Sequence, residues 1–425
     1  MSDVDLREMA QRARDAGRRL ALTPTTVRNG ALEEIARRLE AGGDAIRQAN
    51  EADLADARRA EIAPSLLDRL TLTPQRIRGM VQGCRDIIAL PDPLGELFDG
   101  KTMPNGLRLA KKRVSLGVIG VVFESRPNVT TDISALALKT GNALILRGGK
   151  ETLRTNGVLV DGVRQACEAV GIPADAAQLI TSTDRELVKV LLGMDDLIDL
   201  LIPRGGPGLQ NLVKQHARMP VVYGGIGVCH LYVDESADQA RCIPLIINAK
   251  CQAPSVCNAL DTVLVHRSIA AGFVPAMVAA LHAAGVKVLG DELTLRALEG
   301  APGIRRDLLE QAGAEAYGVE FLSLVLSVKV VETLDEAIAH IARYSTQHSD
   351  GILTNDYAHA SRFLDEVDSA AVFVNASTRF NDGGQFGLGA EVAISTQRMH
   401  ARGPMGLREL TTYKWIVQGD YHVRA

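Results

Sequence analysis

The stretch VSLGVIGVVF, residues 114–123, is an apolar, β-branched run that predicts a buried β-strand. A helical pattern follows near Ser134–Lys139, and a second short apolar strand follows at Ala143–Leu146. A strand, a helix and another strand in such close succession are typical of a βαβ unit with parallel strands. This stretch therefore predicts an α/β fold.

The same alternation continues along much of the chain, with helical patterns between most of the strand-like runs. A parallel sheet covered by helices on both faces is typical of such a pattern. Residues 1 to about 95 are instead predicted to be helical. The further strand-like runs are residues 197–202, 221–223, 230–233, 262–265, 322–331 and 371–374.

Bulk composition limits the possible functions. The chain has 425 residues, enough for two or three domains, with 46% hydrophobic and 23% charged residues. The net charge is −4, and the basic residues are scattered, so neither nucleic acid nor an anionic membrane is an expected partner. The most apolar window, residues 268–286, is rich in alanine and contains Pro275, so we predict a buried helix rather than a membrane span.

The cysteines indicate a reducing compartment. There are six, none forms a CxxC pair, and no histidine lies at zinc-ligand spacing from them, so no metal is expected. The charged first residues also lack the apolar core of a signal peptide. We therefore expect a cytoplasmic protein without disulfides.

Two cysteines in KCQAPSVCNALDTVLVH, residues 250–266, are candidate nucleophiles. Cys257 follows a helical segment and a proline-containing turn, and it precedes a predicted strand. A thiol presented in this way can face a cleft, and nearby backbone N–H groups can lower its pKa. Cys251 lies in the same loop, and either cysteine could instead be a small buried hydrophobic residue. The residues by themselves leave this choice open.

Two glycine-containing turns follow predicted strands. In LLIPRGG, residues 200–206, glycines would let backbone N–H groups approach a pyrophosphate at the start of a helix. In GNALILRGGKE, residues 141–151, two cations after a strand suit a cofactor ribose or its 2′-phosphate. A simple tight turn and solvated surface charge are the respective alternatives. The candidate cofactor-binding residues are Arg147, Lys150, Pro203, Arg204, Gly205 and Gly206.

Taken together, several segments resemble the γ-glutamyl phosphate reductase family of the aldehyde dehydrogenase superfamily. The resemblance runs from about residue 5 to the C-terminus, and the ESRPN and NDGGQFGLGAE segments are specific to the family. It implies an NADPH-dependent reduction of L-glutamyl 5-phosphate to L-glutamate 5-semialdehyde and phosphate, through a cysteine thioester, in proline biosynthesis. The segments are residues 122–130, 139–151, 200–206, 248–266 and 373–415.

The resemblance selects among the candidate residues. In the superfamily a strand with an apolar end followed by histidine lies eight or nine residues after the nucleophile, which matches Cys257 and His266. The superfamily's cofactor-side glutamate matches Glu320, and its basic residue after the strand matches Arg147. Hydrolytic members carry a general-base glutamate where this chain has Val222, so the resemblance implies a thioester protected from water.

Substrate contacts are implied less directly. The resemblance implies Asn128 and the backbone N–H of Cys257 as oxyanion donors, although counting without a gap would put Glu124 in place of Asn128. The substrate carries a carboxylate and a phosphate, both of which suit arginine. Which arginine meets which anion stays open. The candidate substrate-binding residues are Ser125, Arg126, Arg379 and Arg398.

The resemblance also implies an architecture of two doubly wound domains and a small β element. We expect an NADP-binding domain over residues 1–228, interrupted by a hairpin at about 105–118, and a catalytic domain over residues 229–370. Residues 371–425 would return to the first domain and supply a strand, 411–417, that pairs with the hairpin. This element predicts a homo-oligomer, a dimer or larger. The glutamate kinase of the preceding step is a candidate partner.

Three other functions compete with this prediction. A CoA-acylating aldehyde dehydrogenase also lacks the general base. A redox-free acyl transferase or amidase would use the thiol but would need a histidine base beside it. A binding protein could keep the fold without catalysis.

Overall fold

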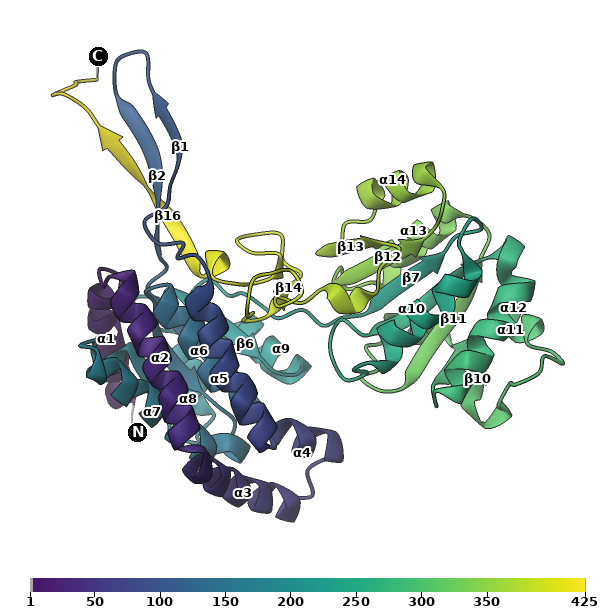
Figure 1. Ribbon diagram of the computed structural model, residues 1–425, viewed down its shortest axis with the longest axis horizontal. Helices are drawn as coiled ribbons and strands as arrows, with labels where there is room; N and C mark the ends of the chain where they lie inside the picture. The colour runs from purple at the N-terminus through teal and green to yellow at the C-terminus, as the bar shows by residue number, and fades with distance from the viewer. Residues whose placement is uncertain (1–2, 425) are drawn as a thin grey trace. The chain divides into compact units, whose positions relative to one another are not determined.

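A computed structural model describes residues 3–424, and the chain divides into two compact units (Figure 1). The first unit comprises Met1–Gly224, Gly387–Ala393 and Met405–Ala425. The second comprises Gly225–Phe386 and Ile394–Pro404. Each unit has its own parallel sheet, which confirms the predicted α/β fold.

The N-terminal part of the first unit is helical, as predicted. Thr73 caps one helix, because its side chain accepts a hydrogen bond from the Arg76 backbone N–H and Pro74 occupies the first turn. The helix that spans Thr25–Ala41, α2, buries Ala31, Ile35 and Leu39 along one face. The helices are α1 (Asp3–Leu20), α2 (Thr25–Ala41), α3 (Gly43–Arg59), α4 (Pro64–Leu70) and α5 (Pro74–Ala89).

The sheet of the first unit has four parallel strands in the order β5-β4-β3-β6. The run 114–123, predicted as one strand, contributes to two. Gly117 interrupts it with a φ of +131°, and the Asp199 side chain accepts a hydrogen bond from the Val118 N–H at 2.8 Å. The strands are β3 (Val118–Phe123), β4 (Ala143–Arg147), β5 (Ala177–Leu179) and β6 (Leu200–Arg204).

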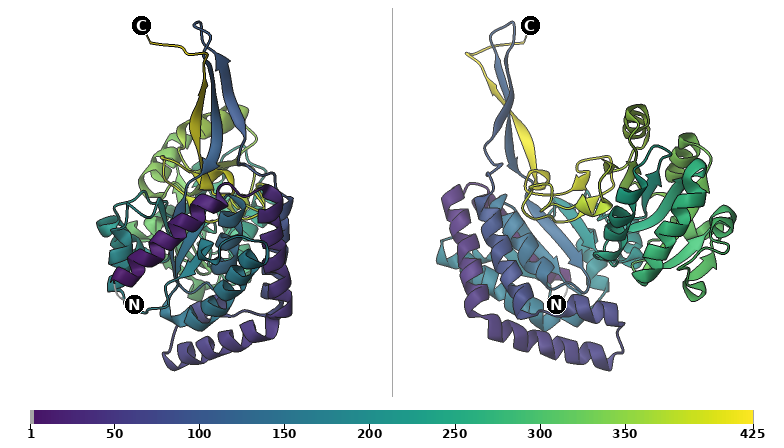
Figure 2. Two further views of the ribbon diagram at one scale, coloured as in Figure 1. Left: turned by 90° about the vertical axis from the view of Figure 1, so that its left-hand side faces the viewer. Right: turned by 45° about the vertical axis from the view of Figure 1, so that its right-hand side comes forward.

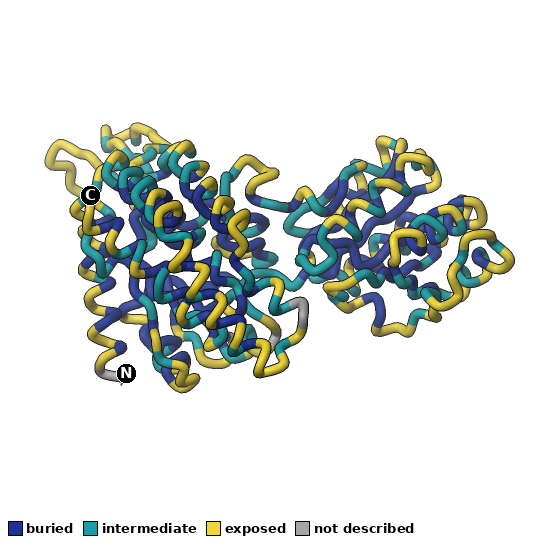
Figure 3. Tube along the Cα trace, turned by 60° about the horizontal axis from the view of Figure 1, so that its bottom comes forward, coloured by how far each residue is buried: buried dark blue, intermediate teal, exposed yellow. Residues whose placement is uncertain are grey.

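Helices pack on this sheet and exclude water from it (Figures 2 and 3). Leu6 and Met9 of α1 lie in one apolar cluster with Val122 and Ile145 of the sheet. Other helices pack on β4 and β5. Residues 221–223, predicted as a strand, form only an isolated bridge from Val221 to Leu201. The additional helices are α6 (Asn128–Lys139), α7 (Leu153–Ala169), α8 (Glu186–Leu192) and α9 (Pro207–His216).

A three-stranded antiparallel sheet also belongs to the first unit. The hairpin of β1 (Leu97–Thr102) and β2 (Arg108–Ser115) pairs through β2 with β16 (Thr411–Gln418), so segments almost three hundred residues apart lie side by side (Figure 1). The predicted pairing of the hairpin with the C-terminal strand is therefore present. The hairpin begins earlier than expected. The sequence did not reveal its first strand, because that strand is mostly exposed and lacks an alternating apolar pattern.

The second unit contains a seven-stranded parallel sheet in the order β10-β9-β11-β8-β7-β12-β13. Residues 371–386, expected in a separate return segment, lie in this unit because β13 pairs with β12. A two-stranded sheet is formed by β14 (Ile394–Ser395) and β15 (Gly403–Pro404). The seven strands are β7 (Cys229–Val233), β8 (Leu260–His266), β9 (Lys287–Gly290), β10 (Leu309–Gln311), β11 (Val325–Val331), β12 (Ser349–Leu353) and β13 (Ala371–Val374).

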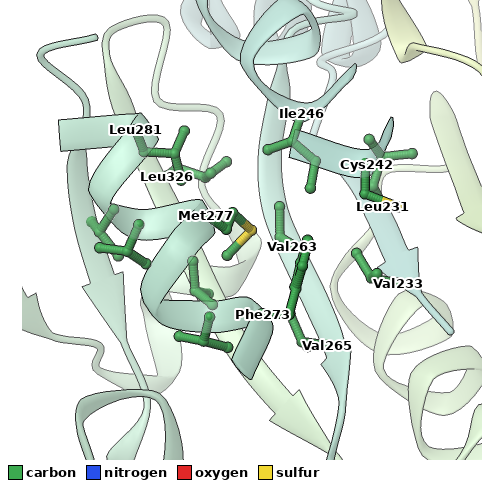
Figure 4. Close-up of a cluster of buried hydrophobic side chains, with 14 of the residues drawn as sticks. Leu231, Val233, Cys242, Ile246, Val263, Val265, Phe273, Met277, Leu281 and Leu326 are labelled. Carbon is green, nitrogen blue, oxygen red and sulfur yellow. The ribbon is translucent and has the colours of Figure 1, made fainter. Parts of the chain in front are cut away.

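The alanine-rich window forms the helix α11 (Arg267–Ala283), which is buried along one face and exposed along the other rather than buried throughout as predicted. Its Phe273 and Met277 belong to a cluster of buried apolar side chains with Val263 and Val265 of β8 (Figure 4). Among the described residues, no helix is long and apolar enough to cross a membrane. The other helices of this unit are α10 (Gln239–Cys251), α12 (Glu292–Ala297), α13 (Leu334–Tyr344) and α14 (Tyr357–Glu366).

Candidate active-site residues in the two units

In the first unit, the carboxyl ends of three parallel strands meet. Val122 of β3 pairs with Arg147 of β4, and Phe123 pairs with Arg204 of β6. The chain passes from β3 to β4 on one side of β3 and later returns to β6 on the other side. Such a switch point is where doubly wound sheets bind ligands, outside the carboxyl ends of the strands. The structure thus brings together the predicted residues after β3, β4 and β6.

The two arginines at this edge retain hydrogen-bonding capacity. Within residues 3–424, the Nε atoms of Arg147 and Arg204 are buried and have no hydrogen-bond partner. Burial lowers the pKa of Arg147, opposed by the charge of Glu151. An unpaired buried donor is costly, and an anionic ligand at this edge would satisfy it. Lys150, by contrast, is exposed at the surface.

The glycine turn after β6 leads directly into α9. Gly206 precedes the helix without a side-chain cap, and its backbone N–H donates to Glu124 Oε2 at 3.0 Å. A Cβ at Gly205 would lie 2.8 Å from the carboxyl carbon of Glu124, so a larger residue there would displace the Glu124 side chain. The turn therefore already binds a carboxylate where a phosphate was predicted. Glu124 thus accepts a hydrogen bond from this turn, whereas the Asn128 amide carries the N–H donors that an oxyanion needs.

Ser125 is held in an unusual backbone conformation. Its φ is +48°, in the left-handed region that residues other than glycine rarely adopt. Glu151 Oε1 accepts hydrogen bonds from the Ser125 backbone N–H at 3.0 Å and from its hydroxyl at 2.9 Å. Ser125 is thus buried and bound to Glu151, a residue that the sequence did not single out.

Asn128 is the first residue of α6, and its amide has a fixed partner. The Nδ2 group donates to Asp132 Oδ2 at 2.9 Å, across one helical turn. Desolvation raises the pKa of Asp132 to about 6, opposed by the hydrogen bond from Asn128 and the charge of Arg204. The half-buried Arg126 lies on the same segment.

In the second unit, Cys257 lies between the end of α10 and the start of β8. Its side chain and that of Cys251 are partly exposed, whereas the other four cysteines are buried. The Cys257 carbonyl oxygen accepts a hydrogen bond from Cys229 Sγ at 3.2 Å. Burial raises the pKa of Cys229 well above its ordinary value, so Cys229 remains a neutral thiol. The turn therefore holds Cys257 by its backbone, and the residue as a whole is partly exposed.

Gly227, just before β7, packs directly on the Cys257 backbone. A Cβ at Gly227 would lie 2.5 Å from the Cys257 carbonyl carbon and 3.0 Å from its Cα. Only glycine allows this approach. The Gly227 N–H donates to Glu320 Oε1 at 3.0 Å. Glu320, predicted to face the cofactor, is thus in contact with the backbone beside the nucleophile. The glycine-rich run YGGIG before a strand was the available signal for Gly227.

A buried ion pair lies at the base of this turn. Lys250 Nζ is 3.4 Å from Asp261 Oδ1, and both side chains are almost completely buried. Burial raises the pKa of Asp261 to about 6, opposed by Lys250, and burial lowers the pKa of Lys250. Asp261 also accepts a hydrogen bond from the Phe321 N–H at 3.2 Å. The pair therefore connects α10, β8 and the segment after Glu320, and no local pattern predicts it.

The two predicted arginines of the second unit differ in their contacts. Arg379 Nε donates to Gln252 Oε1 at 3.0 Å, on the segment that leads to Cys257. Arg398 instead forms an ion pair with Asp368 and is 70% exposed. The contacts thus connect Arg379, but not Arg398, to the nucleophile turn. Among the residues that the structure describes, no cluster of three or more His, Cys, Asp or Glu could hold a metal ion.

Comparisons with known proteins agree with this fold. The profile of the aldehyde dehydrogenase family matches residues 1–295. The chain is 54% identical over 424 residues to a γ-glutamyl phosphate reductase of Roseiflexus castenholzii, covering 99% of this chain and 100% of the relative. It is 52% identical over 420 residues to that of Escherichia coli, with 99% and 100% covered. The crystal structure of the Thermotoga maritima γ-glutamyl phosphate reductase has a TM-score of 0.94 at 46% identity, with 99% and 100% covered.

Proposed function

Because the chain belongs to the γ-glutamyl phosphate reductases of the aldehyde dehydrogenase family, we propose that it reduces L-glutamyl 5-phosphate to L-glutamate 5-semialdehyde and phosphate. This reaction would serve proline biosynthesis, with NADPH as the reductant. One structural observation carries the proposal: a partly exposed Cys257, whose backbone is fixed by Gly227 and Cys229. A preorganised thiol of this kind suits covalent catalysis.

In the proposed first step, the Cys257 thiolate attacks the γ-carbonyl carbon of the substrate. A C–S bond forms, the bond from that carbon to the phosphate oxygen breaks, and phosphate leaves with the electron pair. The developing oxyanion would accept hydrogen bonds from the Cys257 backbone N–H and from Asn128. Asp132 would keep the Asn128 amide oriented, since it accepts one of the two amide hydrogens.

The thioester must then survive until it is reduced. A bound NADPH supplies the hydride for this reduction. Collapse of the resulting thiohemiacetal breaks the C–S bond, releases the aldehyde and regenerates the thiolate. Hydrolytic relatives would use a general-base glutamate at the position of Val222, which here is a buried apolar residue. A side chain that cannot activate water protects the thioester.

The strand ends of the first unit fit a dinucleotide. Arg147 and Arg204 each offer a buried, unpaired Nε donor, which suits the phosphate groups. Lys150 is exposed on the turn after β4 and would join Arg147 in favouring the 2′-phosphate of NADPH over NADH. The backbone of Pro203, Gly205 and Gly206 would lie along the pyrophosphate, which requires that Glu124 leave the Gly206 N–H. Pro203 has no N–H and would not donate. Glu320 would accept a hydrogen bond from a ribose hydroxyl.

The substrate carries two anionic groups. We assign residues to them from the contacts that each residue makes in the structure. Arg379 is connected to the Cys257 turn and would bind the carboxylate. Arg126 and Ser125 belong to the first unit's strand-end segment and would bind the phosphate, which for Ser125 requires that its hydroxyl leave Glu151. Arg398 is paired with Asp368, so a role in binding requires that this exposed ion pair open.

We also propose that the chain assembles through β16. This edge strand exposes Tyr413, Trp415 and Val417, and its outer backbone groups are open to pair with another strand. A row of exposed apolar side chains on a sheet edge is typical of an interface between subunits. Association with the preceding glutamate kinase is a second proposal, carried by the family alone.

The decisive experiment measures NADP⁺ reduction with L-glutamate 5-semialdehyde, with and without phosphate. We expect turnover that requires phosphate in the wild type and falls at least about 10³-fold in Cys257→Ala. Turnover with CoA in place of phosphate would instead identify a CoA-acylating enzyme. Phosphate-independent turnover, or full activity of Cys257→Ala, would contradict the proposal. Loss of activity in Cys251→Ala alone would overturn only the assignment of the nucleophile.

A further inference from the structure

We propose that a small cavity of the second unit binds the amino-acid end of the substrate, with Arg379 contacting its α-carboxylate and Asp382 its α-ammonium group. The inference rests on the proposed function, since it assigns the substrate's head group to a site beside Cys257. The cavity has a volume of about 180 Å³, which suits a small polar group. It is lined by Asn248, Gln252, Arg379, Phe380, Asp382 and Gln385.

The two charged groups of the cavity are held in place by neutral partners. Gln252 Oε1 accepts a hydrogen bond from Arg379 Nε at 3.0 Å, which orients the guanidinium and leaves its two Nη groups for a ligand. Asp382 Oδ1 accepts hydrogen bonds from the backbone N–H groups of Gly384 at 2.9 Å and Gln385 at 3.1 Å. These contacts fix both charges without neutralising either.

Neither charge has an ionic partner in the part of the chain that the structure describes. Within residues 3–424, no carboxylate forms an ion pair with Arg379, and no basic side chain forms one with Asp382. A guanidinium and a carboxylate that line one cavity without pairing are complementary to a zwitterion, which offers a carboxylate to one and an ammonium to the other. An α-amino acid is the ligand class with this charge pattern.

The cavity is connected to the nucleophile by hydrogen bonds. Asn258, directly after Cys257, donates through Nδ2 to the Asn381 carbonyl at 2.9 Å. The backbone carbonyl oxygen of Asn258 accepts a hydrogen bond from Thr378 Oγ1 at 2.8 Å. Thr378 and Asn381 flank Arg379 on the chain, so the segment that carries the cavity is tied to the Cys257 turn. The short side chain of a glutamyl group requires its head-group site to adjoin the reacting thiol.

This assignment makes the cavity a determinant of substrate specificity. An aldehyde without the α-amino group would leave Asp382 without a cation, and one without the α-carboxylate would leave Arg379 without an anion. A site built for a polar group rejects analogues that lack it, because its own polar atoms then remain unpaired. The cavity would therefore exclude simple ω-aldehyde acids and amino aldehydes.

The test compares full-length wild type, Asp382→Asn and Arg379→Lys on three aldehydes with NADP⁺ and phosphate. The aldehydes are L-glutamate 5-semialdehyde, 5-oxopentanoate, which lacks the amino group, and 4-aminobutanal, which lacks the carboxylate. We expect Asp382→Asn to lower kcat/KM for the semialdehyde about 10- to 100-fold. With 5-oxopentanoate, the loss of kcat/KM in Asp382→Asn should be less than about threefold, since this aldehyde has no ammonium group to bind. Arg379→Lys should show the corresponding pattern with 4-aminobutanal.

Asp365→Asn, an exposed change on α14, is the matched control and should behave as wild type on all three aldehydes. An equal loss on every aldehyde in Asp382→Asn would overturn the assignment, because the residue would then only support the turn. A wild type that oxidises none of the aldehydes would contradict the proposed function separately. In that event, calorimetric binding of L-glutamate decides the cavity: equal affinity for wild type and Asp382→Asn would overturn it.

Discussion

Gly227→Ala tests whether the backbone contact beside Cys257 positions the nucleophile. The added Cβ would lie 1.5 Å from the Cys257 carbonyl oxygen and 2.5 Å from its carbonyl carbon, whereas non-bonded carbons are about 3.5–4.0 Å apart. One of the two segments must therefore move by more than about 1 Å. A displacement of about 1 Å at a catalytic group already costs about 100-fold in rate. This loss corresponds to about 2.7 kcal/mol of transition-state stabilisation.

Two measurements check this prediction. The first is kcat for NADP⁺ reduction, which should fall about 100-fold. The second does not depend on the substrate: the alkylation rate of Cys257, followed by peptide mass spectrometry, should change, while that of Cys251 should not. Gly272→Ala is the matched control, since a Cβ on that α11 residue meets nothing within 4 Å. A folded Gly227→Ala protein with wild-type kcat and wild-type Cys257 alkylation would refute the positioning role.

Two further predictions concern stability and assembly. Because the folded pKa of Asp132 is raised to about 6, its ionisation lowers the free energy of unfolding as the pH rises from about 4 to about 6. Asp132→Asn should therefore stabilise the protein relative to wild type by about 1–3 kcal/mol at pH 8 and by little at pH 4. Denaturant titrations at the two pH values measure this difference in the free energy of unfolding. An identical difference at both pH values would contradict the prediction. Val417→Lys, on exposed β16, should yield a smaller particle by light scattering with an unchanged unfolding midpoint, whereas an unchanged particle mass would contradict the proposed interface.

The sequence predicts the sheets best where strands are uniformly apolar. The runs at β4 and β13 satisfy this condition, and each forms a strand close to its predicted range. β12 was not predicted, because its sequence is SDGIL and polar residues occupy buried positions in it. The Asp350 carboxylate accepts hydrogen bonds there from the backbone N–H of His230 at 2.9 Å and from the Ser345 hydroxyl at 2.6 Å. Such partners lie far along the chain or outside any periodic pattern, so local patterns cannot reveal them.

The candidate site was predictable in type but not in its contacts. Strand-end turns and a thiol before a strand follow local rules, so Arg147, Arg204 and Cys257 could be named as candidates, although these rules did not separate Cys257 from Cys251. The supporting residues were not, since their roles arise from contacts between distant segments. Glu151 holds Ser125, and Asp261 pairs with Lys250 out of water. A carboxylate in a sequence gives no sign of whether it will face solvent or a buried donor.

Glu320 contacts the backbone beside the nucleophile and is also the predicted cofactor residue. The resemblance assigns it to the cofactor, whereas the structure gives its Oε1 a hydrogen bond from the Gly227 N–H. The two roles are compatible, because a carboxylate has about four acceptor positions on two oxygens. Gly227 in turn packs on the Cys257 backbone, so a ribose bound to Glu320 would act on a residue already in contact with the nucleophile turn. Because binding free energy at one contact can bias the position of its neighbour, cofactor binding would help to fix Cys257 for reaction.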